Sequence, residues 1–411
     1  MYKTLWNNPD IRFYMTAGAV SRLGDSLSAM AFLFLAYDLT GSALHTTGIA
    51  LAETIPYLLF GLIGGGVADA LPKKRLLVTL DLLRVPLMLT VVALEMMNML
   101  SFSVLFASSF LIQSAGCFFN PAHRSVLPMV TTEAERSAAN SLYDTLTRGI
   151  TIATPVAAAA LIQTAGVIHF FTLDACTYLL SAFVLSKLHL KESNKSLPSP
   201  KFIFSSIYEF LTWMVGKVRV RHLFVLTFYT VFLNTWVWEV GILLALEELT
   251  SESEKLYSMI KGVFGAVVII TNLCIPFFIR SFSLKHYITG ACLWGLGLFY
   301  LGVFYSPGHF FIGTILIGIG LPTASLARVY LIQKLVPEEK MGRAFSTNAV
   351  LLYGSNTLSL LLYGLLTSIL STPSLMMVSG TLMLIPFFTI VLWMLIGSTK
   401  LCRRFPVHLF K

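Results

Sequence analysis

The sequence predicts an all-α integral membrane protein, with 12 transmembrane helices in two six-helix bundles and both termini in the cytoplasm. Its residues are 56% hydrophobic and only 12% charged, against a charged share of ~25% in soluble domains. Apolar runs of about 20 residues recur along the whole chain, and each is long enough to cross a hydrocarbon core of ~30 Å. The runs are continuously apolar rather than alternating, which excludes a β-barrel.

Each predicted span is an apolar run that polar, glycine-containing or proline-containing turns delimit. The first six cover 12–37, 44–68, 76–97, 101–122, 137–163 and 168–187. The second six cover 221–246, 256–280, 286–305, 309–332, 343–367 and 374–398. No cleavable signal peptide is evident at the start of the chain, so we expect the first span to be retained.

A long connection divides the two sets of six spans. Leu188–Val220 is rich in proline, serine and cations, which indicates a cytoplasmic linker with a short surface helix around Phe202–Met214. The predicted domains are therefore an N-terminal bundle (1–187), a linker (188–220) and a C-terminal bundle (221–411).

The net charge of +9 reports topology rather than nucleic-acid binding. Most of the 29 Lys and Arg residues lie in alternate connections between spans, as the positive-inside pattern requires of cytoplasmic loops. We therefore expect a multi-pass membrane protein whose surroundings are the lipid bilayer, and no nucleic-acid partner.

An internal repeat supports the division into halves. A shift of 206 residues (336 minus 130) lays Val130 on Val336, and the same shift lays Glu133 on Glu339. In both halves this polar turn joins the fourth span to the fifth. A parallel six-plus-six repeat is a known transporter architecture, with the ligand site between the halves near the bilayer midplane.

The turn after the second span reads GGVADALPKKR (Gly65–Arg75), and with the rest of the chain it resembles the major facilitator superfamily. The family signature there is Gly, three spacers, Asp, Arg, a spacer, Gly and two basic residues. Gly65, Asp69, Lys73 and Lys74 match it, whereas Ala70 and Pro72 depart from it. Further stretches resemble the bacterial exporters of drugs, macrolides and siderophores such as enterobactin: Ser21–Leu44, Asp81–Arg84, Asn120–Pro128, Ala138–Leu142 and Gln333–Ser346.

The resemblance implies a secondary active transporter of the bacterial plasma membrane. It would export a small amphipathic organic molecule by alternating access, with proton antiport as its coupling. A lysophospholipid or another lipid-like molecule is the alternative substrate. We expect a monomer without cofactor or metal, energised by the proton gradient. An enzyme is not expected, because no HExxH, GxSxG or P-loop motif is present and the five cysteines are scattered singly.

Two acids inside spans are the first candidates for proton coupling or substrate binding. Asp25 and Glu53 both lie near mid-membrane on helices adjacent in sequence, and an intramembrane charge requires a partner, a cavity or a function. The structural alternative for Asp25 is a local ion pair with Arg22, three residues earlier on the same helical face.

The fifth and seventh spans carry the other substrate candidates. Asp144 and Arg148 are four residues apart and either form a structural pair or present Arg148 to an anionic substrate group. The Gly-Pro pair that the resembled exporters carry in this span is absent. Glu239, between tryptophans in NTWVWEV, suits a cationic organic ligand, although tryptophans near a helix end also form interfacial belts.

The cytoplasmic ends of the second to fourth spans are expected to form a gate. In the resembled family the aspartate at the position of Asp69 meets a helix N-terminus from the other half, where the helix dipole stabilises a carboxylate. We expect Arg124 to supply its cationic partner because Ala70 cannot. Asp81 and Arg84 are expected as a second pair. The predicted gate residues are Gly65, Asp69, Lys73, Lys74, Arg124, Asp81 and Arg84.

Overall fold

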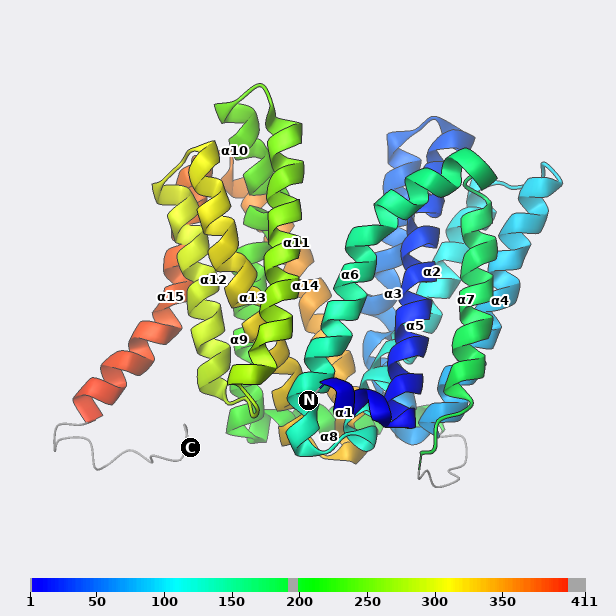
Figure 1. Ribbon diagram of the computed structural model, residues 1–411, viewed down its shortest axis with the longest axis horizontal. Coiled ribbons are helices and arrows are strands. Elements are labelled where there is room, and N and C mark those ends of the chain that lie inside the picture. The colour runs from blue at the N-terminus through cyan, green and yellow to red at the C-terminus, as the bar shows by residue number, and fades with distance from the viewer. Residues whose placement is uncertain (1, 191–198, 398–411) are drawn as a thin grey trace. The chain divides into compact units, whose positions relative to one another are not determined.

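The computed structural model of the protein describes residues 2–190 and 199–397, and within these ranges all regular secondary structure is helical (Figure 1). The chain divides into two compact units. The first consists of residues 1–213 and 336–350, and the second of residues 214–335 and 351–411. The predicted linker lies partly outside the described residues, at 191–198, and so does the end of the chain from 398 on.

The first unit holds the N-terminal helices together with the end of one connection and the start of a later helix. Its helices are α1 (Tyr2–Asn7), α2 (Pro9–Thr40), α3 (Ala43–Ala70), α4 (Lys73–Met96), α5 (Phe102–Val130), α6 (Glu133–Ala165), α7 (His169–Leu185) and most of α8 (Pro200–Gly216). The 3₁₀ turn η2 (Glu338–Lys340) and the first turns of α14 (Met341–Leu366) also belong to it.

Local sequence signals set the ends of α2. The Asn8 side chain accepts hydrogen bonds from the backbone N–H groups of Asp10, at 3.0 Å, and Ile11, at 3.4 Å. Pro9 occupies the first turn, where no helical donor is required. Gly41 ends the helix in the left-handed conformation (φ 61°), which glycine adopts without steric cost.

Two buried apolar clusters fill the first unit. One joins α2, α4, α5 and α7 and includes Phe32, whose ring meets Phe171 edge-on at a centroid distance of 4.7 Å. The other lies toward the opposite ends of these helices and includes Tyr14, whose ring stacks on His123 at 4.2 Å. The apolar sides that face neighbouring helices therefore form the interior of a helical bundle.

The second unit is a further helical bundle. Its elements are α9 (Val218–Trp236), η1 (Val237–Gly241), α10 (Ile242–Leu249), α11 (Ser253–Phe278), α12 (Leu284–Val303), α13 (Pro307–Leu335), the rest of α14 and α15 (Thr372–Gly397). The predicted span 221–246 is helical throughout. Its middle, η1, is a five-residue π-helical turn between the α-helices α9 and α10. Hydrophobic run length does not reveal such a turn, because the apolar run continues through the π-helical residues and the α-helical residues on either side.

Small residues let α12 pack closely against two neighbours. A Cβ atom added to Gly320 of α13 would lie 2.3 Å from the Trp294 backbone nitrogen of α12, and one added to Gly380 of α15 would lie 2.3 Å from that of Phe299. Such contacts require glycine, and close backbone approach is the usual basis of helix association in membranes. The packing of the second unit thus depends on backbone geometry as much as on apolar side chains.

Length and composition support membrane insertion. Within the described ranges, ten helices are long and apolar enough to cross a membrane, and two shorter apolar helices cover His169–Leu185 and Thr372–Pro386. The predicted surface helix near 202–214 is α8. The count of twelve spans and the cytoplasmic termini stay predictions.

We predict that Gly320→Ala lowers the thermal unfolding midpoint of the purified protein, because the added methyl group forces α12 and α13 apart. Overpacking of this kind costs roughly 1–3 kcal/mol. Gly364→Ala in α14 is the matched control, since a Cβ atom there would meet nothing within 4 Å. Equal midpoints for the two variants, measured by scanning fluorimetry in detergent, would contradict the close packing.

Candidate functional site

Asp69, the last acid of α3, binds the first turn of α14 within the first unit. Its carboxylate accepts hydrogen bonds from the backbone N–H groups of Gly342, at 2.5 Å, and Arg343, at 3.1 Å. The Arg343 Nε donates to the same carboxylate at 2.9 Å, and both side chains are at least nine-tenths buried. Asp69 therefore satisfies free donors at a helix N-terminus and neutralises a buried guanidinium at once.

Three consecutive glycines position Asp69. An added Cβ atom would lie 2.1 Å from the Cys117 carbonyl oxygen of α5 at Gly64, 2.6 Å from the Ser346 Cβ of α14 at Gly65, and 2.9 Å from Ile203 of α8 at Gly66. Each glycine thus faces a different helix. Close helix contact at this run therefore depends on the lack of side chains, and we call the contact of α3 with α8 and α14 the α3–α14 junction.

Helix α8 completes the junction. The Arg343 Nη1 donates to the Ser206 carbonyl oxygen at 2.8 Å, and Lys340 forms an ion pair with Glu209. The hydrogen bond and the charge from Lys340 lower the pKa of the Glu209 carboxyl. Backbone and charged groups of α8 therefore hold the start of α14 from a second side.

The expected cation for Asp69 was wrong. Arg124 is exposed, and no hydrogen bond or ion pair links it to Asp69 or to any other described residue. Arg343 takes that role, from a helix more than 200 residues further along the chain. The sequence holds Arg343 within QKLVPEEKMGRAFS, but nothing local in that stretch indicates that its guanidinium faces α3.

Two lysines of the predicted gate follow Asp69 in the sequence. Lys74 donates to the Leu188 carbonyl oxygen at 2.9 Å, and Lys73 is half-buried.

A second polar group lies inside the first bundle, on α2, α4 and α7. We call Asp25, Asp81, Arg84, Asp174 and Tyr178 the α2–α4–α7 cluster. Tyr178 donates its hydroxyl proton to the half-buried Asp25 at 2.7 Å. A Cβ atom added to Gly24 would lie 2.1 Å from the Asp174 Oδ1, so the absence of a side chain at Gly24 admits this carboxyl against α2.

Arg84 is the cation of this cluster. Its Nη1 lies 3.4 Å from the Asp81 Oδ1, with side-chain exposures of 4% and 0%. The guanidinium also faces the rings of Phe119, at 4.9 Å, and Tyr178, at 5.2 Å. Contacts of this kind stabilise a desolvated cation. The predicted Asp81–Arg84 pair is formed. It was predicted as part of the gate at Asp69, but in the structure Arg84 contacts Tyr178.

Charge balance distinguishes this cluster from an ordinary buried ion pair. Three carboxyl groups surround one guanidinium, and Asp81 and Asp174 are fully buried. One oxygen of each of these two acids accepts no hydrogen bond from any described residue. Two uncompensated charges inside an apolar bundle are costly, so neutrality requires protons or a further cation.

Tyr178 was missed by sequence reasoning because tyrosines in spans usually pack as apolar rings.

Glu53 and Arg22 are not members of this cluster. Glu53 is half-buried in α3, and no hydrogen bond or ion pair reaches it from the described residues. Arg22 donates to the Thr151 hydroxyl of α6 at 3.4 Å, so the expected local pair of Arg22 with Asp25 is not formed. Asp25 is instead bound from α7, through Tyr178.

Asp144 and Arg148 pair within α6. The Arg148 Nε lies 2.6 Å from the Asp144 Oδ2, with exposures of 31% and 25% for the two side chains. The predicted structural pair is therefore present, and its partial exposure leaves Arg148 accessible to an anionic group.

Glu239 lies on η1 in the second unit with its side chain 56% exposed. The Lys261 Nζ lies 3.9 Å from this carboxylate, 4.3 Å from the centroid of the Trp238 ring and 5.1 Å from that of Tyr257. Trp238 is buried in the core of the unit, which contradicts the alternative of an interfacial belt. Two aromatic rings and an acid here bind an ammonium group that the protein itself supplies.

A family comparison matches almost the whole chain. The family model for transmembrane secretion effectors aligns with residues 7–400. Macrolide efflux protein A of Streptococcus pyogenes is 24% identical over 92% of this chain and 95% of its own length. The multidrug efflux pump Tap of Mycolicibacterium fortuitum is 29% identical over 43% of this chain and 44% of its own length.

Solved structures share the fold. A bacterial homologue of the iron transporter ferroportin, in an outward-facing state, gives a TM-score of 0.73 at 16% identity and covers 93% of this chain and 99% of its own. The fucose:proton symporter of E. coli gives 0.72 at 14% identity, over 92% of this chain and 97% of its own.

We predict that Asp69→Asn destabilises the protein, because the amide keeps the size of the side chain but loses the charge opposite Arg343. Hydrogen bonds to charged groups contribute roughly 1.5–3 kcal/mol each, so the thermal unfolding midpoint should fall measurably. Lys73→Gln removes a charge from the adjacent turn and should leave the midpoint within error. A junction held by packing alone would give Asp69→Asn an unchanged midpoint.

Proposed function

The chain belongs to the transmembrane secretion effectors of the major facilitator superfamily, and we propose that it exports a small amphipathic organic molecule in exchange for protons. The proposed substrate class is that of the drugs and macrolides named for its relatives. The observation that carries the proposed coupling is the α2–α4–α7 cluster, with three carboxyl groups around one guanidinium.

The cluster suits a proton carrier because its charge balance changes with each proton. A proton on Asp25 or Asp174 removes a buried negative charge next to Arg84, and its release restores that charge. The Tyr178 hydroxyl, which donates to Asp25 at 2.7 Å, keeps the carboxyl oriented in either state. Glu53 is a second candidate for coupling, because this half-buried carboxyl has no hydrogen bond or ion pair with a described residue and so can bind a proton or a substrate cation.

Coupled export then follows from differential binding in alternating access. Protonation must favour one facing state and substrate the other, since a ligand that binds both states equally shifts no equilibrium. The junction at Asp69 offers a contact that forms or breaks between such states. At this junction the Asp69 carboxylate binds backbone N–H groups at a helix N-terminus and the Arg343 guanidinium. Water can replace both kinds of partner when the contact breaks.

Selectivity is assigned to two partly exposed groups. Glu239, with Trp238, would attract a cationic substrate, and that substrate would compete with Lys261 for the acid and the rings. Arg148 would attract an anionic group at the expense of Asp144. An amphipathic molecule with one charged group and an apolar body fits either arrangement.

We predict that Asp25→Asn abolishes proton-driven export while substrate exchange continues. Asparagine keeps an acceptor for Tyr178 but cannot take up a proton. In everted vesicles supplied with a macrolide such as erythromycin, proton-driven accumulation should be lost, because an intramembrane acid is required to carry the proton. Counterflow of labelled macrolide, which needs no proton movement, should persist.

Asp38→Asn, at an exposed position near the end of the same helix, is the control and should transport normally. Unimpaired proton-driven accumulation in Asp25→Asn would refute the assignment of coupling to this cluster. Loss of both accumulation and counterflow would place Asp25 in substrate binding instead.

We predict that Glu53→Gln also abolishes proton-coupled export without preventing assembly in the membrane. Glutamine matches the shape of the side chain, so only the titratable group is lost. The control is Glu95→Gln, close to the end of α4. Vesicles that contain Glu53→Gln and still release protons when macrolide is added would show that Glu53 takes no part in coupling.

A further inference from the structure

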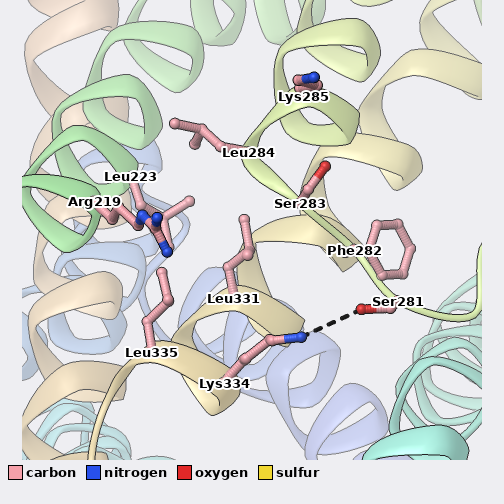
Figure 2. Close-up of a pocket in the computed structure, with 10 residues that line it drawn as sticks. All are labelled: Arg219, Leu223, Ser281, Phe282, Ser283, Leu284, Lys285, Leu331, Lys334 and Leu335. Atoms are coloured by element: carbon pink, nitrogen blue, oxygen red, sulfur yellow. Dashed lines mark hydrogen bonds between the residues drawn. The ribbon is translucent and has the colours of Figure 1, made fainter. Parts of the chain in front are cut away.

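A cavity of about 220 Å³ lies within the second unit, where α9, the α11–α12 connection and α13 meet (Figure 2). Its walls are Arg219, Leu223, Ser281, Phe282, Ser283, Leu284, Lys285, Leu331, Lys334 and Leu335. None of these residues belongs to the candidate sites described above.

The charge of this cavity is of one sign. Arg219, Lys285 and Lys334 line it, and none of its lining residues is acidic. The surrounding sequence is equally one-sided, since 210–238 and 255–337 contain no Asp or Glu. Three cations around one cavity produce a local positive potential that favours an anion.

The remaining walls are suited to an anion that carries an apolar tail. Five of the ten lining side chains are Leu or Phe, and two are serines. The Lys334 ammonium donates to the Ser281 hydroxyl at 3.4 Å, as the dashed line in Figure 2 shows. Ser283 is the N-cap of α12, so the first turn of that helix adds its positive dipole end on the same side.

We propose that this cavity binds the phosphodiester headgroup of an anionic phospholipid such as phosphatidylglycerol. Basic pockets between membrane helices on the cytoplasmic side are suited to such headgroups. Arg219, Lys285 and Lys334 lie at the ends of α9, α12 and α13 that the positive-inside pattern assigns to that side. The volume is below the ~300–1,000 Å³ that encloses a drug-sized ligand, which favours a headgroup over a whole substrate. Apolar walls favour a lipid over free phosphate. Binding here is independent of what the protein exports.

The test is native mass spectrometry of the purified, delipidated full-length protein. The probes are dioctanoyl phosphatidylglycerol, dioctanoyl phosphatidylcholine and inorganic phosphate. The double variant Arg219→Gln/Lys285→Gln removes two lining cations. The double variant Lys217→Gln/Arg280→Gln removes two cations from the same segments that do not line the cavity, and is therefore matched in net charge.

The expected result is one bound phosphatidylglycerol per protein, held about tenfold or more weakly by Arg219→Gln/Lys285→Gln, because each cation near a phosphate strengthens binding severalfold. The matched control should bind within about twofold of the unmodified protein, and the zwitterionic lipid should bind weakly. Equal affinity in both double variants, or equal affinity for the two lipids, would overturn the proposal. Binding of inorganic phosphate that displaces phosphatidylglycerol would identify free phosphate as the ligand and reject the lipid.

Discussion

The bilayer supplies neither counter-charge nor hydrogen bonds, and the polar interior of this protein is organised by that constraint. A buried charge in such a medium is tolerated when the protein itself provides its partner. Asp69 meets Arg343, Asp81 meets Arg84, and Asp144 meets Arg148. The first of these pairs joins helices far apart in the sequence. The other two lie within one helix and stabilise the charge locally.

Close backbone contact is the second consequence of the same medium. Lipid tails are as apolar as leucine side chains, so helices gain little from apolar burial alone and associate where small residues allow close packing. Gly65 admits α14 against α3, and Gly24 admits the Asp174 carboxyl against α2. The charged contacts of the first unit therefore depend on positions without side chains.

The two units differ in the chemistry of their interiors. In the first, carboxyl and guanidinium groups of α2, α4 and α7 lie together. In the second, neutral hydrogen bonds connect the helices, such as that from the Trp294 indole to Asn234, at 2.7 Å, and that from Thr235 to Asn356, at 2.7 Å. Neutral bonds carry no net charge change, whereas the charged cluster responds to each proton. This difference is the reason for assigning coupling to the first unit.

The sequence by itself determined the helical membrane class, the family and most helix positions, because hydrophobic run length and loop charge are local properties. It also identified the pairs Asp81–Arg84 and Asp144–Arg148, whose spacing of three or four residues places them on one helical face. Only the tertiary structure decided that Asp69 binds Arg343 rather than Arg124, that Asp25 binds Tyr178 rather than Arg22, and that cations from three segments line one cavity. Such partners depend on how helices pack and rotate against one another, and the spacing of residues along the chain does not predict contacts between different helices.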